Sequence, residues 1–216
     1  MATRSGTGSP PGALARPPAA DLAWLAIAVL FISSSGPIIA ATVAPALAIA
    51  FWRCFLGSAA TLTVVVTRHL DEVRAMTRHE WWLVVSAGLL LGAHFATWIP
   101  SLRFTTVASS TALVATQPVW AAIIARQRGA HIPRSAWIGI GISLIGVLVL
   151  TGVDVSVDPR HLIGDALALA GAVLAAAYVT VGESARKTVS TATMTSGLYA
   201  SAGVLLLALC IVGRQP

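Results

Sequence analysis

Seven apolar stretches, each about as long as a helix that crosses a bilayer, occupy most of this chain. A helix rises about 1.5 Å per residue, so about 20 apolar residues cover the roughly 30 Å hydrocarbon layer. Hydrophobic residues make up 56% of the 216 residues and charged residues only 10%, which is far from the balance of a water-soluble domain. The sequence therefore predicts an all-α fold, an integral membrane helix bundle with about seven spans, at residues 22–40, 46–67, 81–101, 105–125, 135–152, 162–182 and 192–213.

The basic residues fall mostly on one side of these spans. Of the 14 Lys and Arg residues, ten precede odd-numbered spans or follow even-numbered ones: Arg4, Arg16, Arg68, Arg74, Arg78, Arg126, Arg128, Arg134, Arg186 and Lys187. Three lie on the other side, at Arg103, Arg160 and Arg214, and Arg53 lies within the second span. Short basic loops stay in the cytoplasm, so we expect a plasma (inner) membrane protein with a cytoplasmic N-terminus. This bias explains the net charge of +6, and no nucleic-acid partner is expected.

The chain divides into a tail and two unequal parts. Residues 1–20 are rich in Pro, Gly, Ala and Ser and predict a disordered cytoplasmic tail. A weak internal similarity at an offset of 144 residues aligns Asp21 with Asp165, and both aspartates suit helix N-termini. Five spans separate the two copies, and an odd number of spans inverts the second copy in the membrane. We expect a five-helix repeat at 21–152 and a partial second repeat of two helices at 153–216. A cleaved signal peptide is the alternative for the first span.

Arg53 is the one formal charge clearly inside a span. Its burial costs at least about 2.5–3.5 kcal/mol, so the side chain should face the bundle interior or water. There it could bind a carboxylate or phosphate of a substrate; the alternative is an arginine that snorkels or caps carbonyls of a neighbouring helix. His94 lies at a similar depth in the next span, with Trp98 one turn further along the same face. His94 is either a proton-sensitive group or an ordinary buried polar residue, and Trp98 either a contact residue or an interfacial aromatic.

The fourth span carries a polar stripe at helical spacing that includes Ser110, Gln117 and Trp120. Pro118 removes a helix hydrogen bond and should bend this span, and Gly36 with Pro37 should bend the first. We take the stripe, together with the Tyr178 hydroxyl, as candidate substrate contacts; the alternative is contact between helices. Glycines in spans three and five should allow close helix packing, at Gly88, Gly92, Gly139, Gly141 and Gly146.

Several segments together resemble the EamA-type transporters of the drug/metabolite transporter superfamily. They are His94-Phe-x-x-Trp98-x-x-Ser101-Leu102, Thr105-x-x-Ala108-Ser109-Ser110, Pro118 late in span four, and Phe51-Trp52-Arg53. The resemblance implies ten spans in two inverted five-helix repeats around a cavity. It also implies export or exchange of small polar metabolites, such as amino acids, by alternating access. The chain departs from that pattern by lacking three further spans, and by Arg126-Gln127-Arg128 where relatives often carry Gly-Glu.

These departures leave two hypotheses about function open. In the first, the chain transports a small-molecule substrate within the bilayer, with a second copy as the expected partner that completes the cavity. In the second, it is a truncated, non-transporting membrane remnant or scaffold subunit. An enzyme is not expected, because paired carboxylates, a metal cluster or a Ser/His arrangement at membrane depth are missing. A retinal photoreceptor would need a lysine in a span, and Lys187 lies in a loop. No cofactor or metal is expected.

Overall fold

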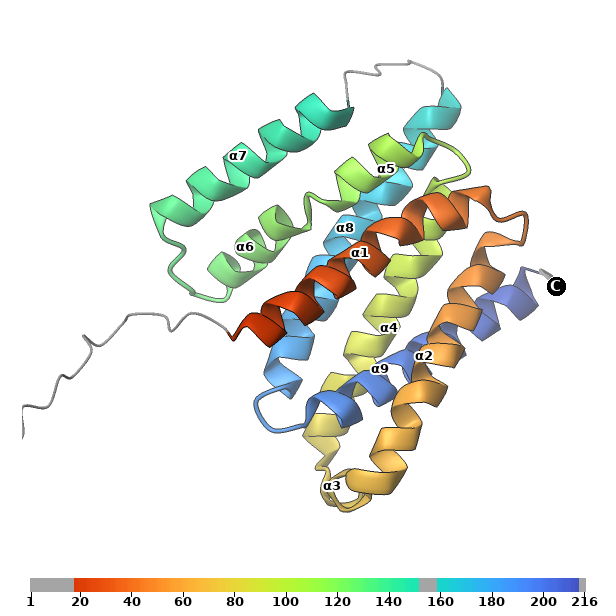
Figure 1. The fold of residues 1–216 in the computed structure, drawn as a ribbon, viewed down its shortest axis with the longest axis vertical. Coiled ribbons are helices and arrows are strands. Elements are labelled where there is room, and N and C mark those ends of the chain that lie inside the picture. Colours follow the sequence, from red (N-terminus) through yellow and green to blue (C-terminus); the bar gives the residue numbers. More distant parts are fainter. Residues whose placement is uncertain (1–17, 152–158, 214–216) are drawn as a thin grey trace, which may run out of the picture. The chain divides into compact units, whose positions relative to one another are not determined.

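The computed structural model describes residues 18–151 and 159–213, with only the backbone at Leu150 and Thr151. Residues 1–17 of the predicted tail lie outside the described part, as do 152–158. All regular secondary structure in the described residues is helical (Figure 1). The helices are α1 (Ala19–Ala41), α2 (Ala46–Arg68), α3 (Leu70–Ala75), α4 (Arg78–Ser101), α5 (Val107–Val114), α6 (Gln117–Gln127), α7 (Arg134–Thr151), α8 (Pro159–Ala185) and α9 (Thr191–Val212).

Six helical segments are long and apolar enough to cross a membrane: α1, α2, α4, α5 with α6, α8 and α9. Each lies where the sequence predicts a span, so six of the seven predicted spans are confirmed as apolar helices of membrane-spanning length. The seventh lies at α7, whose described apolar part, Arg134–Val149, is shorter. The count of seven spans and their organisation as repeats stay predictions.

The fourth predicted span is interrupted at Ala115 and Thr116, between α5 and α6. Pro118 has no N–H to donate to the carbonyl of Val114, and the helix breaks over that turn. By contrast, α1 continues through Pro37 as one helix, and a bend there stays a prediction. The prediction that Asp165 lies at a helix N-terminus is wrong. The helix α8 begins at Pro159, a residue that suits the first helical position because its missing N–H would have no partner there.

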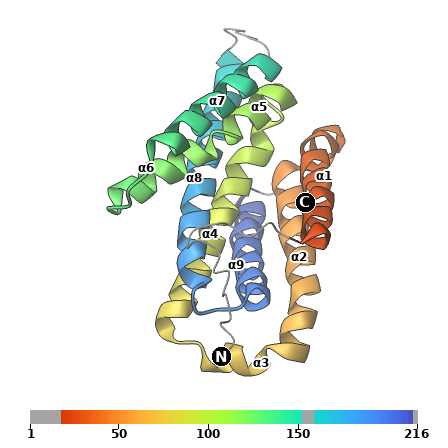
Figure 2. The ribbon, with the colours of Figure 1, turned by 60° about the vertical axis from the view of Figure 1, so that its left-hand side comes forward.

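The chain divides inside α1, between Ser35 and Gly36, into two compact units. The first unit contributes helix only up to Ser35, and α2 to α9 all belong to the second. Within the second unit the helices contact one another in the order α7, α5 with α6, α8, α4, α9, α2 (Figures 1 and 2). The most extensive contact joins α4 to α8, and the main core lies where α2, α4 and α9 meet.

Small residues set the distance between these helices. A Cβ atom added at Gly88 of α4 would lie 2.6 Å from the Leu198 carbonyl oxygen of α9, and one at Gly92 would lie 3.1 Å from that of Ala202. Lipid provides no hydrophobic drive for helix association, so this close approach supplies the packing contacts that hold α4 to α9. The prediction of close packing is therefore confirmed at Gly88 and Gly92. It is wrong at three glycines of α7, where an added Cβ meets nothing among the described residues: Gly139, Gly141 and Gly146.

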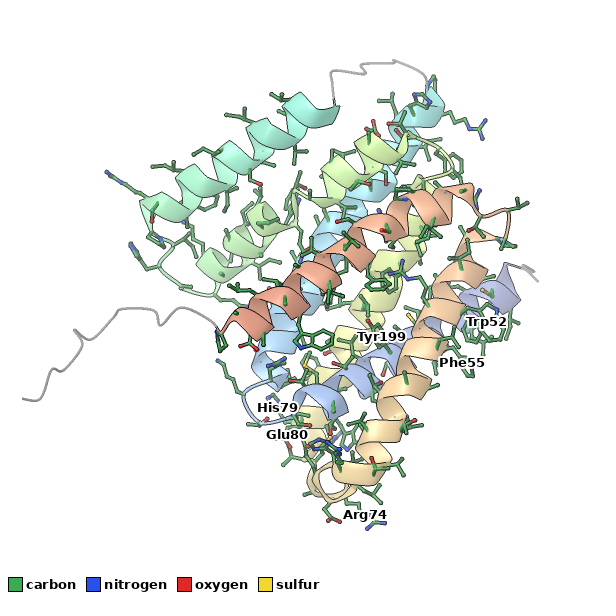
Figure 3. All side chains as sticks on the ribbon, viewed as in Figure 1. Trp52, Phe55, Arg74, His79, Glu80 and Tyr199 are labelled. Atoms are coloured by element: carbon green, nitrogen blue, oxygen red, sulfur yellow. The ribbon has the colours of Figure 1, made fainter. Side chains whose placement is uncertain are left out.

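One end of the bundle carries basic residues at helix ends and connections, and we call it the basic end; it includes Arg68, Arg74, Arg78, Arg128 and Lys187. Here α2 leads through α3 into α4, and α8 turns into α9. Thr77 caps α4 in a capping box, accepting from the Glu80 backbone N–H while the Glu80 carboxylate accepts from the Thr77 N–H at 2.8 Å. Figure 3 labels Arg74, His79 and Glu80 in this region. The basic end thus has defined helix starts, fixed by local sequence.

Candidate functional site

Arg53 of α2 lies against the aromatic side chains of α4. Its guanidinium carbon is 4.9 Å from the Phe95 ring centroid and 5.9 Å from that of Trp98. A cation over an aromatic face is stabilised by about 0.5–2 kcal/mol, depending on how far the pair is removed from water. Its neighbour Trp52 is 55% exposed, on the outer side of α2 with Phe55 (Figure 3).

A pocket of about 420 Å³ opens beside Arg53. It is lined by Ala44, Pro45, Ala48, Ile49, Trp52, Arg53 and Leu56. Among these residues Arg53 is the one charged group, and the others are apolar or aromatic. An anionic group that entered this pocket would meet a single cation whose other contacts include the rings of Phe95 and Trp98.

His94 is fixed in position from two helices. Its Nδ1 lies 2.8 Å from the Gly171 carbonyl oxygen of α8, and the residue is 7% exposed. A carbonyl only accepts, so Nδ1–H is the donor and the uncharged ring carries its lone pair on Nε2. The imidazole stacks on Trp98 at 5.7 Å between centroids and 9° between planes, and it lies 6.3 Å from the Tyr178 ring. His94 is therefore a positioned part of an aromatic cluster.

The indole nitrogen of Trp98 is buried and has no hydrogen-bond partner among the described residues. A buried donor without a partner costs about 1–3 kcal/mol, and most such groups in proteins are paired. No other buried side-chain nitrogen or oxygen in the described part of the chain lacks a hydrogen-bond partner. The cluster thus holds one N–H donor that finds no partner among the described residues.

The polar residues of α5 and α6 lie elsewhere and have partners of their own. The Ser110 side chain, fully buried, lies 2.7 Å from the Ser101 hydroxyl of α4. The hydroxyl of Ser109 donates to the Asp165 carboxylate of α8 at 3.0 Å. These bonds tie α5 to α4 and α8, which matches the alternative of contact between helices for this part of the stripe.

Gln117 and Trp120 follow the break in the fourth span. The Trp120 indole N–H donates to the Thr116 hydroxyl at 3.2 Å, across the first turn of α6. Gln117 is partly buried, and its amide has no hydrogen bond within the described residues. Neither residue shares a hydrogen bond or ring contact with the cluster in the described structure. The structure thus brings Arg53, His94, Trp98 and Tyr178 together and places Ser110, Gln117 and Trp120 apart from them.

Sequence reasoning missed two members of the cluster. Phe95 is 7% exposed and provides the ring nearest to Arg53. Its spacing of three residues from Trp98 would have placed both rings on one helix face. No sequence pattern marked the Gly171 carbonyl, because the approach of two helices decides which backbone carbonyl becomes a hydrogen-bond partner. Within the described residues, no three His, Cys, Asp or Glu side chains group as metal ligands.

Six helical segments of the described residues, long and apolar enough to cross a membrane, are typical of an integral membrane protein. Residues 21–152 match the EamA-like transporter family, and this match spans more than half of the chain. The chain therefore belongs to the EamA-like transporter family, a family of membrane transporters. None of the curated proteins and none of the solved structures compared with the chain matches it.

Proposed function

We propose that this protein transports small polar metabolites, such as amino acids or related carboxylates, across the inner membrane. The observation that carries the proposal is the position of the Arg53 guanidinium, on the apolar helix α2, over Phe95 and Trp98 and beside a pocket. In this proposal the substrate carboxylate binds Arg53, because arginine presents paired N–H donors that match a carboxylate. The basic end faces the cytoplasm.

The remaining groups of the cluster suit a substrate with polar and apolar parts. In this proposal the Trp98 indole N–H, which has no partner among the described residues, donates to a substrate acceptor, and that bond would recover the cost of the unpaired donor. The aromatic rings of His94 and Tyr178 border the same cluster and would contact an apolar part of the substrate. Ligand sites commonly combine apolar walls with a few fixed polar groups.

We further propose that transport proceeds by alternating access between inverted repeats. The helix boundaries support this organisation, since α1 ends at Ala41 and α8 at Ala185, which are 144 residues apart. The helices α2 and α9 end at Arg68 and Val212, also 144 residues apart. This is the offset of the similarity around Asp21 and Asp165. Inverted repeats are the parts that rock against each other in many secondary transporters.

Transport assays on purified protein in liposomes test the proposal. Exchange of radiolabelled amino acids would be measured for the wild type, Arg53→Gln and Arg53→Lys. A charge-assisted hydrogen bond contributes about 1.5–3 kcal/mol, so Arg53→Gln should reduce apparent affinity by about 10- to 100-fold. Arg53→Lys keeps the positive charge and should lose less apparent affinity than Arg53→Gln. The control is Arg74→Gln, which removes an exposed arginine paired with Asp71 at the basic end and should transport as the wild type does.

Two results would contradict the proposal. Wild-type transport by Arg53→Gln would remove Arg53 from the substrate site. Absence of exchange for amino acids and related carboxylates by the wild-type protein would instead favour a non-transporting scaffold.

A further inference from the structure

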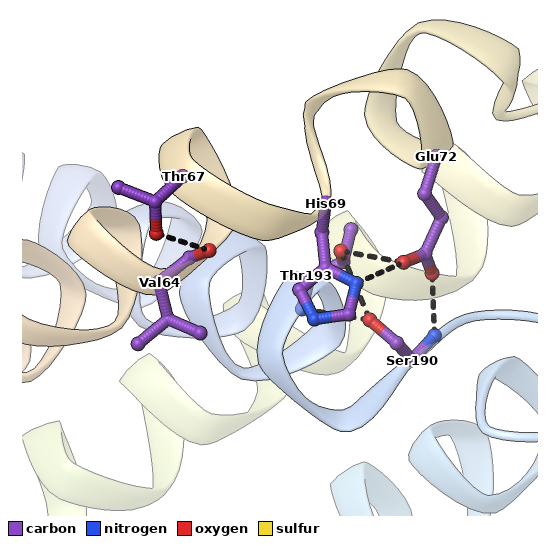
Figure 4. A network of polar contacts seen from close by, with 6 residues as sticks. All are labelled: Val64, Thr67, His69, Glu72, Ser190 and Thr193. Carbon is purple, nitrogen blue, oxygen red and sulfur yellow. Dashed lines mark hydrogen bonds and ion pairs between the residues drawn. The ribbon is translucent and has the colours of Figure 1, made fainter.

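A carboxylate from the connection between α2 and α4 holds the start of α9. Glu72 of α3 accepts the Ser190 backbone N–H at 2.5 Å through one oxygen. Its other oxygen accepts from the Thr193 hydroxyl at 3.1 Å and lies 3.1 Å from Nδ1 of His69 (Figure 4). These contacts join residues 118 and 121 positions apart in the chain. We call this set of contacts the Glu72 clasp.

The clasp is favourable for the charged form of Glu72. Ser190 is the N-cap of α9, and a negative charge at a helix N-terminus is stabilised by the unpaired N–H groups and the helix dipole. Partial burial of the carboxylate opposes its ionisation, but hydrogen bonds from Ser190 and Thr193 and the nearby His69 together lower the pKa of Glu72. By contrast, the neighbouring Asp71 is fully exposed and pairs only with Arg74 at the surface.

The first turn of α9 is also a wall of a pocket. This pocket, of about 430 Å³, is lined by Tyr178, Val179, Gly182, Glu183, Arg186, Lys187 and Met194. It extends from charged side chains at the basic end to Tyr178, whose ring lies 6.3 Å from that of His94. Met194 follows Thr193 directly and lies close against α8, because a Cβ added at Gly182 would be 2.7 Å from its methyl carbon. The first turn of α9 therefore contributes Met194 to the lining of this pocket, and the other lining residues belong to α8 or follow it.

We infer that the Glu72 clasp controls access from the basic end of the bundle to the pocket that ends at Tyr178. The clasp ties a segment inside the family match, residues 21–152, to a helix beyond it. Relative movement of these two parts at the basic end has to stretch or break the bonds to Ser190 and Thr193. For its role in transport this inference rests on the proposed function, in which the pocket is the cytoplasmic approach to the substrate cluster.

Thiol labelling tests the clasp without a substrate. The full chain would carry Met194→Cys, with the two native cysteines, Cys54 and Cys210, both buried, replaced by alanine. The reaction rate with a water-soluble maleimide would then be compared with and without Glu72→Gln. Loss of one charge-assisted contact is expected to raise the rate about fivefold or more, because α9 leaves its clasped position more often. The matched control, Asp71→Asn, removes the adjacent exposed carboxylate and should leave the rate unchanged.

Equal labelling rates with and without Glu72→Gln would overturn the inference, and so would an equal rise in Asp71→Asn. If Glu72→Gln does not fold, Thr193→Val takes its place, since it removes one donor of the clasp. A rise in its labelling supports the clasp and an unchanged rate overturns it. Because labelling needs no transport, a chain that moves no solute would refute the proposed function while this result stands.

Discussion

The ring nitrogens of His94 have different environments, and this difference is testable. The Gly171 carbonyl faces Nδ1 at 2.8 Å inside a cluster from which bulk water is largely excluded. A carbonyl can only accept, so the neutral ring should exist as the Nδ1–H tautomer. Nitrogen-15 NMR of histidine-labelled protein at neutral pH should show a protonated Nδ1 and an unprotonated Nε2 for the signal that disappears in His94→Phe.

The opposite assignment of that signal, with Nε2 protonated, would contradict the hydrogen bond to Gly171. The other four histidines of the chain, His69, His79, His131 and His161, give reference signals in the same spectrum. The result matters for function, since it decides which ring nitrogen a substrate donor could reach.

Glu72 should make stability depend on pH in a defined direction. Its pKa in the folded protein is lowered from the ordinary value of 4.5, by the bonds to Ser190 and Thr193 and by His69, against the opposing effect of burial. A lowered folded-state pKa means that the contribution to stability is fully present above about 4.5 and is lost as the pH falls through the folded value.

Thermal unfolding in detergent would measure this dependence. The difference in Tm between a protein with Glu72 and its Glu72→Gln variant should stay constant down to about pH 5 and close at lower pH. Both proteins would carry His69→Gln, so that Glu72 is the titrating group of the contact. A difference that widens as the pH falls below 4.5 would show that the carboxylate is not stabilised in the fold.

At the scale of helices, glycines that look alike in the sequence have opposite environments. A methyl group at Gly88 would approach the Leu198 carbonyl oxygen and the Ser201 Cβ to 2.6 Å, and a backbone atom cannot give way cheaply. At Gly139 the same methyl group meets no described atom within 4 Å. Gly88→Ala should therefore destabilise the protein by about 1–3 kcal/mol through overpacking. Gly139→Ala should be neutral or slightly stabilising, because alanine favours the helix.

Reversible unfolding of the two variants in mixed micelles gives both values under one condition. The comparison is internal, since each variant adds one methyl group to an apolar helix. Equal stabilities would mean that α4 and α9 do not approach as closely as the fold requires.

Helix positions were predictable from the sequence because the length of an apolar run is set by bilayer thickness. The starts and ends of the predicted spans lie close to those of the helices, and Pro118 marked the break in the fourth span. The short helix α3 was not predicted, because six residues with three charges carry no apolar period. The sequence could not distinguish the close packing at Gly88 from the open space at Gly139, because the difference depends on whether another helix faces each glycine.

At the scale of the whole molecule, part of the candidate site followed from the sequence. Arg53 and His94 stood out because polar groups are rare at membrane depth, and the structure places both beside Trp98. The Glu72 clasp did not stand out, because carboxylates in loops are common and only the fold brings this one to Ser190. Contacts between distant segments depend on which helices become neighbours. No local sequence pattern predicts the order of helices from α7 through α8 and α4 to α2.

The distribution of basic residues predicts the orientation of the bundle in the membrane. Arg74 and Arg128 lie at helix ends of the basic end, and Arg160 lies at the start of α8, at the opposite end of that helix from Lys187. Positive loops stay in the cytoplasm. The introduced cysteines of Arg74→Cys and Arg128→Cys should therefore be protected from an impermeant maleimide in intact cells. A cysteine at 160 should react, and permeabilised cells should expose all three. Reaction at 74 but not at 128 in intact cells would contradict the antiparallel course of α4, α5 and α6, because this course requires both positions to share one side of the membrane.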